Sequence, residues 1–283
     1  KIKPSYSFIK VLNEFKNLKK KYKWGPNIYY KIAAIKKIHP TYIQKILADS
    51  RYKKHDHLNL INLLGKSDTK KFNPYKLINT AYFLKTKPKG FWKPSSMIKN
   101  KDVLILGSGK NLLIKKSIIE KIVKKKKLFV IALNIFKSIK EDLIQLRVSC
   151  HPFRLISDST NYKKFNKKLV IPFSMMRENL KKIVNKNFYY DFGLTITNNN
   201  TIKIKSNYCE LPYPLAIAYA ISIAISGKAK SIALAGFDGY KTSDADKDNT
   251  EEVLKIMKDN FIKRKKIINL TKNNYKQLIF RNL

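Results

Sequence analysis

Apolar residues follow one spacing before about residue 87 and another after residue 102. In the first stretch they recur every three or four positions, which places them on one side of a helix; the first such run contains Phe8, Val11, Leu12, Phe15 and Leu18. Proline and glycine interrupt this pattern and divide it into five short segments; the breaks fall at Gly25-Pro26, His39-Pro40, Gly65 and Asn73-Pro74. The sequence therefore predicts a small all-helical domain over residues 1–87.

Residues 88–101 show no apolar period and contain Pro88, Gly90 and Pro94. Because proline and glycine interrupt helices and strands, this composition is typical of a connecting segment. We expect residues 88–101 to be a linker between two domains.

After residue 102, short apolar segments alternate with amphipathic ones. Short apolar segments predict buried strands, at 103–106, 128–133, 153–156, 169–173, 231–235 and 267–270. Helices are expected at 112–123, 139–146, 213–226 and 251–262, with a hairpin over 195–204 that turns at Asn198, Asn199 and Asn200. Buried strands alternating with helices are typical of parallel sheets. The expected fold class is α/β, with a mostly parallel Rossmann-like sheet over residues 102–283 and helices on both of its faces.

The charge of this 283-residue chain is strongly positive. It carries 60 Lys and Arg against 19 Asp and Glu, a formal net charge of +41, and only six of the basic residues are Arg. Lys is poorer than Arg at paired contacts with phosphates and base edges, so we do not expect nucleic acid as a partner. A Lys-rich face would still attract anionic substrates and an anionic membrane surface.

The cysteine content and the hydropathy of the chain give an expectation for its cellular compartment. Cys150 and Cys209 are too few for a disulfide framework and suit a reducing environment. The sequence contains no run of 18 apolar residues and no secretory signal. We expect a cytoplasmic protein, with peripheral attachment at the inner face of the membrane left open.

The sharpest local motif is an apolar strand, 103–106, followed by Gly107-Ser108-Gly109-Lys110 and a helix. In such a unit the glycines permit a tight turn and let a phosphate approach the free amides at the start of the helix. Lys110 adds a cation at the same place. Leu112 stands where a dinucleotide fingerprint needs its third glycine, so NAD is disfavoured. Two interpretations stay open, a loop for nucleotide phosphate and a tight turn without ligand.

Other polar residues lie near the ends of predicted strands, and the carboxyl ends of parallel strands form the edge where ligands bind. His151 and Arg154 lie near the strand predicted over 153–156. Asn134 ends the second strand and could hydrogen-bond a base or ribose, or cap the next helix. Gly236 and Asp238 follow strand 231–235, and Asp238 could face a sugar hydroxyl or a metal, or be an ordinary turn residue. His151 is a candidate general base, against a purely structural role, and Arg154 is a candidate phosphate ligand.

Together, the loop 103–109, Asn134 and the apolar helix followed by 231–239 resemble the nucleotide-binding core of bacterial sialyltransferases that use CMP-sugars. They also resemble motility-accessory-factor flagellin glycosyltransferases and the archaeal 6-hydroxymethylpterin diphosphokinase-like domain. This chain has Lys110-Asn111 where the loop of these families usually reads Pro-Ser. The resemblance implies that the nucleotide of a CMP-sugar donor is contacted by Gly107, Ser108, Gly109 and Asn134.

Residues 22–83 carry a second resemblance. With Trp24-Gly25-Pro26 and His39-Pro40-Thr41, they are similar to the helical C-terminal region of 4-hydroxy-2-oxovalerate aldolase-like proteins. In that family a metal-dependent barrel of the HMG-CoA lyase type precedes this region and carries the metal ligands and the catalytic arginine. These 283 residues do not include that barrel, so the resemblance implies a fragment of a lyase and does not support aldolase chemistry by the chain itself.

The leading hypothesis is an enzyme, a glycosyltransferase that binds a nucleotide sugar and acts on a glycan acceptor in bacterial surface-polysaccharide synthesis. The expected ligand is a CMP-sugar donor, with Mg²⁺ as an option. One alternative is the lyase fragment. The other is a pterin or nucleotide diphosphokinase, which needs Mg²⁺ and carboxylates near the phosphate loop; candidates are Asp238, Asp244 and Asp246.

Overall fold

A computed structural model describes residues 83–84, 86–136, 139–151, 154–155, 168–178, 181, 184, 189–197, 201–239, 245–259 and 267–280. The chain divides into two compact units, residues 1–81 with 243–245 and residues 82–242 with 246–283. The two sheets and the helices described below belong to the second unit, except for Ala245 at the start of the last helix. The predicted helical domain, 1–87, lies almost entirely outside the described residues.

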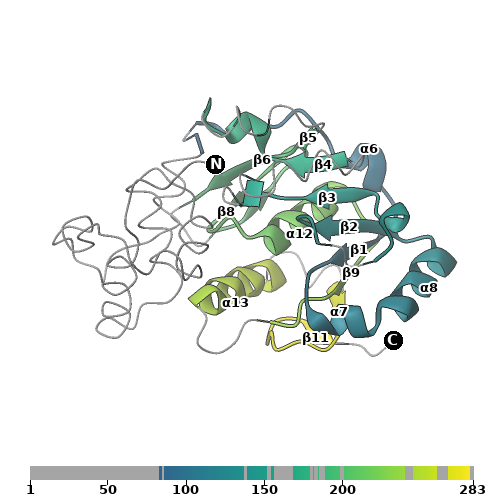
Figure 1. Cartoon of the computed structure of the whole chain (residues 1–283). Coiled ribbons are helices and arrows are strands. Elements are labelled where there is room, and N and C mark those ends of the chain that lie inside the picture. The colour runs from purple at the N-terminus through teal and green to yellow at the C-terminus, as the bar shows by residue number, and fades with distance from the viewer. Residues whose placement is uncertain are drawn as a thin grey trace, which may run out of the picture. The chain divides into compact units, whose positions relative to one another are not determined.

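Eight strands form one sheet in the order β11-β10-β9-β1-β2-β3-β4-β5, and all seven neighbouring pairs are parallel (Figure 1). The strands are β1 (Asp102–Leu106), β2 (Phe129–Leu133), β3 (Leu146–Val148), β4 (Lys168–Ile171), β5 (Tyr189–Asp191), β9 (Ser231–Ala235), β10 (Ile267–Asn269) and β11 (Ile279–Phe280). The chain runs outward from β1 to β5, returns to β9 on the other side of β1, and continues outward to β11. This is a doubly wound, Rossmann-like order.

Helices cover both faces of this sheet. In β1, Val103 and Ile105 belong to one buried cluster, whereas Leu104 and Leu106 belong to another, as alternation along a strand requires. The first cluster includes residues of α12 (Ala216–Ser226) and α13 (Ala245–Met257), and the second includes residues of α7 (Lys110–Ile114) and α8 (Lys116–Lys126). The predicted α/β class with helices on both faces is confirmed.

A second sheet of three strands differs from the prediction. It contains β6 (Gly193–Ile196), β7 (Lys203–Ile204) and β8 (Tyr208–Leu211), in the order β6-β8-β7. The hairpin predicted over 195–204 is wrong, because β6 and β7 both pair with β8 and not with each other. β8 lies in the middle of this small sheet, and its residues Cys209 and Leu211 are buried in the same hydrophobic cluster as Val103 and Ile105 of β1.

Two other segments also depart from the prediction. The helix expected over 139–146 is a short 3-10 turn, η3 (Glu141–Leu143), followed by β3, and the strand expected at 153–156 is helical at residues 154–155. β3 lies between β2 and β4, so Leu146 and Val148 are buried by neighbours far away in the sequence. Three residues are too few for a sequence period to reveal.

The segment expected to be a linker packs onto the sheet unit. It contains α6 (Ser95–Ile98), whose Ile98 is fully buried, and the backbone amide of Trp92 donates to the carbonyl of Asp191 at 2.9 Å. The division between the two compact units falls between Ala81 and Tyr82. Residues 88–101 therefore contribute to the core of the second unit.

Candidate functional site

The candidate residues gather at the carboxyl edge of the large sheet. Gly107–Lys110 follow β1, Asn134 follows β2, His151 and Arg154 follow β3, and Gly236 and Asp238 follow β9. These four strands are parallel neighbours in the order β9-β1-β2-β3. The order in which strands are added reverses between β1 and β9, because the chain moves outward from β1 on one side and from β9 on the other. Ligands of doubly wound sheets bind at such a switch point. At a strand spacing of about 4.8 Å, the row spans roughly 14 Å.

The loops after β1 and β9 lie in direct contact. The amide of Gly107 donates to the carbonyl of Ala235, and that of Gly109 to the carbonyl of Gly236, both at 2.8 Å. A Cβ on Gly109 would stand 2.3 Å from Asp238 Oδ1 and 2.7 Å from the oxygen of Gly236. Gly109 has an ordinary extended backbone (φ −65°), so the close approach of the second loop, and not its φ, favours glycine here.

Asp238 occupies the start of α7. Its Oδ2 accepts a hydrogen bond from the backbone N–H of Asn111 at 3.0 Å. We expected the amides at the start of this helix to be open to a phosphate, and for Asn111 this is wrong. A carboxylate at the positive end of a helix stabilises it and repels a second anion. The helix start therefore offers an acid at this point instead of a vacant anion site.

Asp238 Oδ1 is buried and receives no hydrogen bond from the part of the chain that the structure describes. The carbonyl of Asp238 accepts from the amide of Asn274 at 2.9 Å, and Asn111 Nδ2 donates to the carbonyl of Lys272 at 3.0 Å. These bonds fix the loop that carries Asp238. A hydroxyl or amino group of a ligand would satisfy Oδ1.

Next to this loop, Ser108 and Lys110 are exposed, and Gly236 is buried. Gly236 has a left-handed backbone (φ +77°), and its amide donates to Thr271 Oγ1 at 2.9 Å. The conformation favours glycine, and the amide already has a partner in the protein. Gly236 therefore shapes the turn after β9 and has no amide free for a ligand.

Asn134 is held in place by the next strand. It has a left-handed backbone (φ +52°), and its Oδ1 accepts from Ser149 Oγ at 3.0 Å. The backbone N–H of Asn134 donates to the carbonyl of Val148 at 2.8 Å. Asn tolerates this backbone better than most residues. Both bonds connect Asn134 to β3 and the residue after it. The bond from Ser149 orients the side chain, and Nδ2 is its remaining donor.

Arg147 is the residue that the sequence analysis missed. It is 1% exposed, its Nε and Nη2 bind the two carboxylate oxygens of Glu141, and its Nη1 donates to the carbonyls of Asn134 (2.8 Å) and Phe136 (3.2 Å). Arg147 therefore anchors the loop that carries Asn134. The sequence did contain a signal for this role. Arg147 stands between the apolar residues Leu146 and Val148, and arginine is rare in this chain.

His151 and Arg154 follow β3 at the same edge. His151 is half-buried, and its carbonyl accepts from the amide of Leu155 at 3.0 Å. Arg154 is exposed, with its guanidinium carbon 5.7 Å from the centroid of the Phe136 ring. The cation therefore lies beside the loop that follows Asn134.

Neither cysteine fits the role of a nucleophile. Cys150 and Cys209 are both fully buried and free. Burial raises the pKa of both thiols. Cys209 raises the pKa of Cys150 further. For Cys209, a hydrogen bond with Ser222 opposes the rise in pKa and Glu210 adds to it. Since the thiolate is the reactive form, Cys150 does not form a nucleophilic pair with His151.

The far end of the same edge holds a buried acid, Asp191, which is 6% exposed at the end of β5. Its Oδ1 accepts from the amide of Ser174 at 3.0 Å, and its Oδ2 accepts from Ser174 Oγ. Burial raises the pKa of Asp191, and these hydrogen bonds oppose the rise. The pairing with Ser174 gives Asp191 a structural role.

A metal centre finds little support among the described residues. They contain no group of three or more His, Cys, Asp or Glu side chains that could hold a metal ion. The side chains of Asp244 and Asp246, which the diphosphokinase alternative would need, lie outside the described residues. No metal ligand set is therefore assigned.

No family model and no curated protein matches this chain. Residues 22–83, which carry the lyase resemblance, lie outside the described residues except at Phe83. The site is therefore interpreted from its own geometry.

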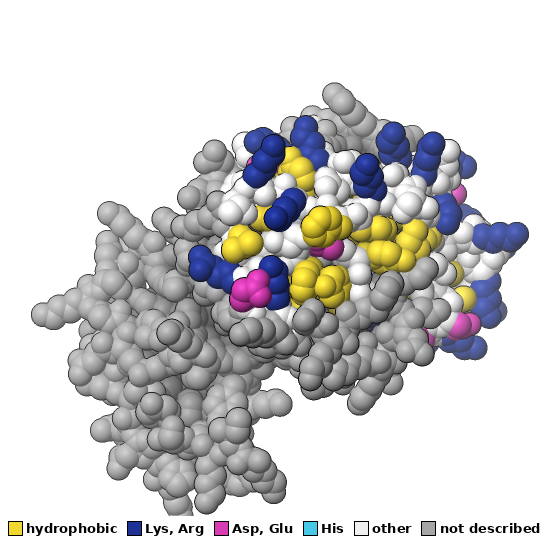
Figure 2. All heavy atoms as spheres, turned by 90° about the horizontal axis from the view of Figure 1, so that it is seen from above, with side chains coloured by type: hydrophobic (Ala, Val, Ile, Leu, Met, Phe, Trp, Pro, Cys, Tyr) yellow, Lys and Arg dark blue, Asp and Glu magenta, His cyan; other side chains and the backbone are white. Residues whose placement is uncertain are grey.

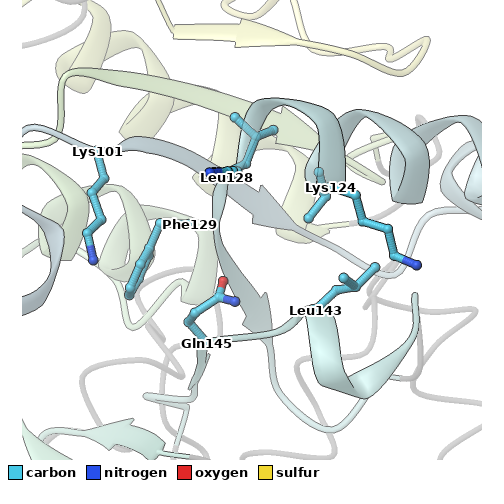
Figure 3. Close-up of a pocket in the computed structure, with 8 residues that line it drawn as sticks. Lys101, Lys124, Leu128, Phe129, Leu143 and Gln145 are labelled. Atoms are coloured by element: carbon cyan, nitrogen blue, oxygen red, sulfur yellow. The ribbon is translucent and has the colours of Figure 1, made fainter.

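A hollow of about 320 Å³ lies at the opposite, amino edge of the sheet (Figure 3). It is lined by Lys101, Val123, Lys124, Lys127, Leu128, Phe129, Leu143 and Gln145. Lys101 Nζ lies 5.1 Å from the centroid of the Phe129 ring, and Gln145 Oε1 accepts from the amide of Val130 at 2.6 Å. None of the candidate site residues lines this hollow, so it is separate from the carboxyl-edge site.

The positive charge is widely distributed. Figure 2 shows the face that lies uppermost in Figure 1, where many Lys and Arg side chains lie beside a group of hydrophobic side chains. No helix in the described part of the chain is long and apolar enough to cross a membrane.

Proposed function

We propose that this protein binds a nucleotide-activated sugar, of the CMP-sugar type, at the carboxyl edge of strands β9, β1, β2 and β3, and transfers the sugar to a glycan acceptor. The observation that carries the proposal is the buried Asp238 Oδ1, which lies beside Gly109 at the switch point and has no protein donor among the described residues. A buried acceptor left unpaired is costly, about 1–3 kcal/mol. A hydroxyl of the donor would satisfy it.

The geometry changes the roles expected from the sequence. Because Asp238 already holds the amide of Asn111, the donor presents hydroxyl groups to this loop and not its phosphate. Asn134 Nδ2, held two strands from Asp238, donates to the base or ribose. Between them, Ser108 lies exposed at the end of β1 and completes a polar row. Such a row suits a ligand that joins two ring systems.

The phosphate would lie near exposed cations. Lys110 and Arg154 are both exposed at this edge, one next to β1 and the other beyond β3. A cation near the phosphate stabilises the charge that develops on the leaving nucleotide. In the proposed reaction the acceptor oxygen bonds the anomeric carbon and the nucleotide monophosphate leaves with the electron pair. His151 takes the proton of the acceptor hydroxyl.

The test is a calorimetric titration of the full chain with CMP, CTP and a CMP-sugar. Asp238→Asn keeps an oxygen for the Asn111 amide but removes the charge, and we expect roughly a tenfold to hundredfold loss of affinity, since a charged hydrogen bond contributes about 1.5–3 kcal/mol. Asn134→Asp keeps the acceptor for Ser149 Oγ and replaces the donor Nδ2. Asp142→Asn is the matched control, because Asp142 is exposed and lies in η3, before β3 begins.

The outcomes separate the alternatives. Binding of cytidine nucleotides that Asp238→Asn weakens and Asp142→Asn leaves unchanged supports the site, and release of CMP in the presence of a glycan acceptor supports the reaction. Absence of binding at millimolar nucleotide refutes the proposal. Transfer from ATP that requires Mg²⁺ would instead favour the diphosphokinase alternative.

A further inference from the structure

The outer surface of α7 and α8, together with the end of β11, is, we propose, a docking surface for an anionic lipid bilayer. This inference does not rest on the proposed transferase activity. Five large hydrophobic side chains are strongly exposed in the described part of the chain, and four of them lie here. These four form what we call the apolar patch: Leu113 (56% exposed), Ile114 (79%), Ile118 (51%) and Phe280 (41%).

The apolar patch lies away from the core of the sheet. Each of these helices buries its other side; the buried residues are Leu112, Ile119 and Val123. Residues three apart share a helix face, so Lys121 lies on the same outer side of α8 as Ile118. Lys115 Nζ stands 5.7 Å from the centroid of the Phe280 ring, which joins the end of β11 to the junction of α7 and α8. Figure 1 shows α7 next to β11, with α8 following it.

The charges around the patch identify its partner. Residues 110–127 contain eight lysines and a single acidic residue, Glu120. Exposed lysines on the outer side of α8 include Lys116, Lys121, Lys124 and Lys125. A second copy of the chain would bring like charges together, and a nucleic acid would leave the aliphatic side chains without a partner. An anionic bilayer fits both features, because its headgroups attract lysines and its acyl boundary accepts apolar side chains.

The two features make different contributions to binding. A lysine near an anionic membrane surface raises the partition coefficient roughly fivefold, and this effect weakens as salt screens the charges. Insertion of the aliphatic side chains depends on buried apolar area and persists at higher salt. Attachment that needs both should therefore decrease when either is removed.

The experiment is flotation of the full chain with vesicles of phosphatidylcholine, with and without phosphatidylglycerol, at low and at moderate salt. Ile114→Ser with Ile118→Ser removes half of the apolar patch, and Phe91→Ser is its control, because Phe91 is 84% exposed and lies outside the patch. Lys121→Glu with Lys125→Glu reverses charge beside the patch. Lys93→Glu with Lys99→Glu is the control of equal charge, on exposed lysines outside α7 and α8.

We expect binding only to vesicles that contain phosphatidylglycerol. The isoleucine pair should lower the partition coefficient about tenfold or more, whereas Phe91→Ser should leave it unchanged. Lys121→Glu with Lys125→Glu should lower the partition coefficient more than the control, Lys93→Glu with Lys99→Glu. Equal losses in both lysine pairs, equal binding to neutral vesicles, or no binding at low salt overturns the proposal. So does self-association in solution that the isoleucine pair abolishes, since the patch would then join copies of the chain.

Discussion

Replacement of Arg147 by methionine tests how the carboxyl edge is held together. Arg147 is 1% exposed and donates to the two oxygens of Glu141 and to the carbonyls of Asn134 and Phe136. Methionine fills a similar volume but donates nothing, so two carbonyls lose their charged donor and Glu141 loses its ion partner.

The loss in unfolding free energy depends on how far the partners of Arg147 are exposed to water. Hydrogen bonds to a charged group contribute about 1.5–3 kcal/mol each, and we take the lower value because the bond to Phe136 is 3.2 Å long. The side chain of Glu141 is 37% exposed, so water can solvate it after the loss, and its ion pair counts for about 0.5 kcal/mol. Together these give about 3.5 kcal/mol for Arg147→Met, which corresponds to roughly 7–14 °C in Tm.

Urea unfolding followed by far-ultraviolet circular dichroism measures this free energy. Arg154→Met is the matched control, because Arg154 is exposed at the same edge, and it should change stability by less than about 0.5 kcal/mol. Glu141→Gln keeps a neutral acceptor and should cost about 1 kcal/mol. If Arg147→Met stays within about 1 kcal/mol of the wild type, or Arg154→Met costs as much, Arg147 does not anchor this loop.

Three further perturbations test other parts of the structure. Gly109→Ala places a Cβ 2.3 Å from Asp238 Oδ1 and should destabilise the chain by about 1–3 kcal/mol in urea unfolding; unchanged stability would contradict the close contact of the two loops. Cys150 and Cys209 are buried with raised thiol pKa values, so a thiol reagent should modify neither in the folded chain and both after denaturation. Because burial raises the pKa of Asp191, its contribution to stability is present below its unfolded pKa and is lost as pH rises through the folded pKa; urea midpoints from acidic to neutral pH should fall less steeply for Asp191→Asn, and identical slopes would exclude this effect.

Local pattern was enough for the elements that are long and strongly apolar. Residues 231–235 were predicted as a strand and are β9, and the apolar stretch at 213–226 contains α12. Such segments bury their side chains in almost any packed arrangement, so periodicity and composition identify them. The alternation of strands with helices also sufficed for the fold class, because a buried parallel sheet needs helices over both faces.

Three of the shortest strands were not found in this way, although the short strand β10 was predicted within 267–270. β3, β5 and β11 have two or three residues each and exist because longer strands lie beside them. The hairpin over 195–204 failed for the same reason, since β8 takes the place between β6 and β7. Strand pairing depends on partners that are distant in the sequence, and no local propensity specifies them.

The candidate site shows the same contrast between what local sequence specifies and what tertiary packing specifies. By itself, the sequence determined that Gly107, Asn134 and Asp238 follow apolar strands, and a parallel sheet then places them at one edge. The strand that His151 follows, β3, was not predicted. Only the tertiary structure decided what these residues touch. Asp238 meets the amide of Asn111 across 127 positions of the chain, and Arg147 turns inward to hold the loop of Asn134. Spacing along the chain fixes the position of a residue on its own strand or turn, but its contacts depend on packing between loops that the sequence does not place together.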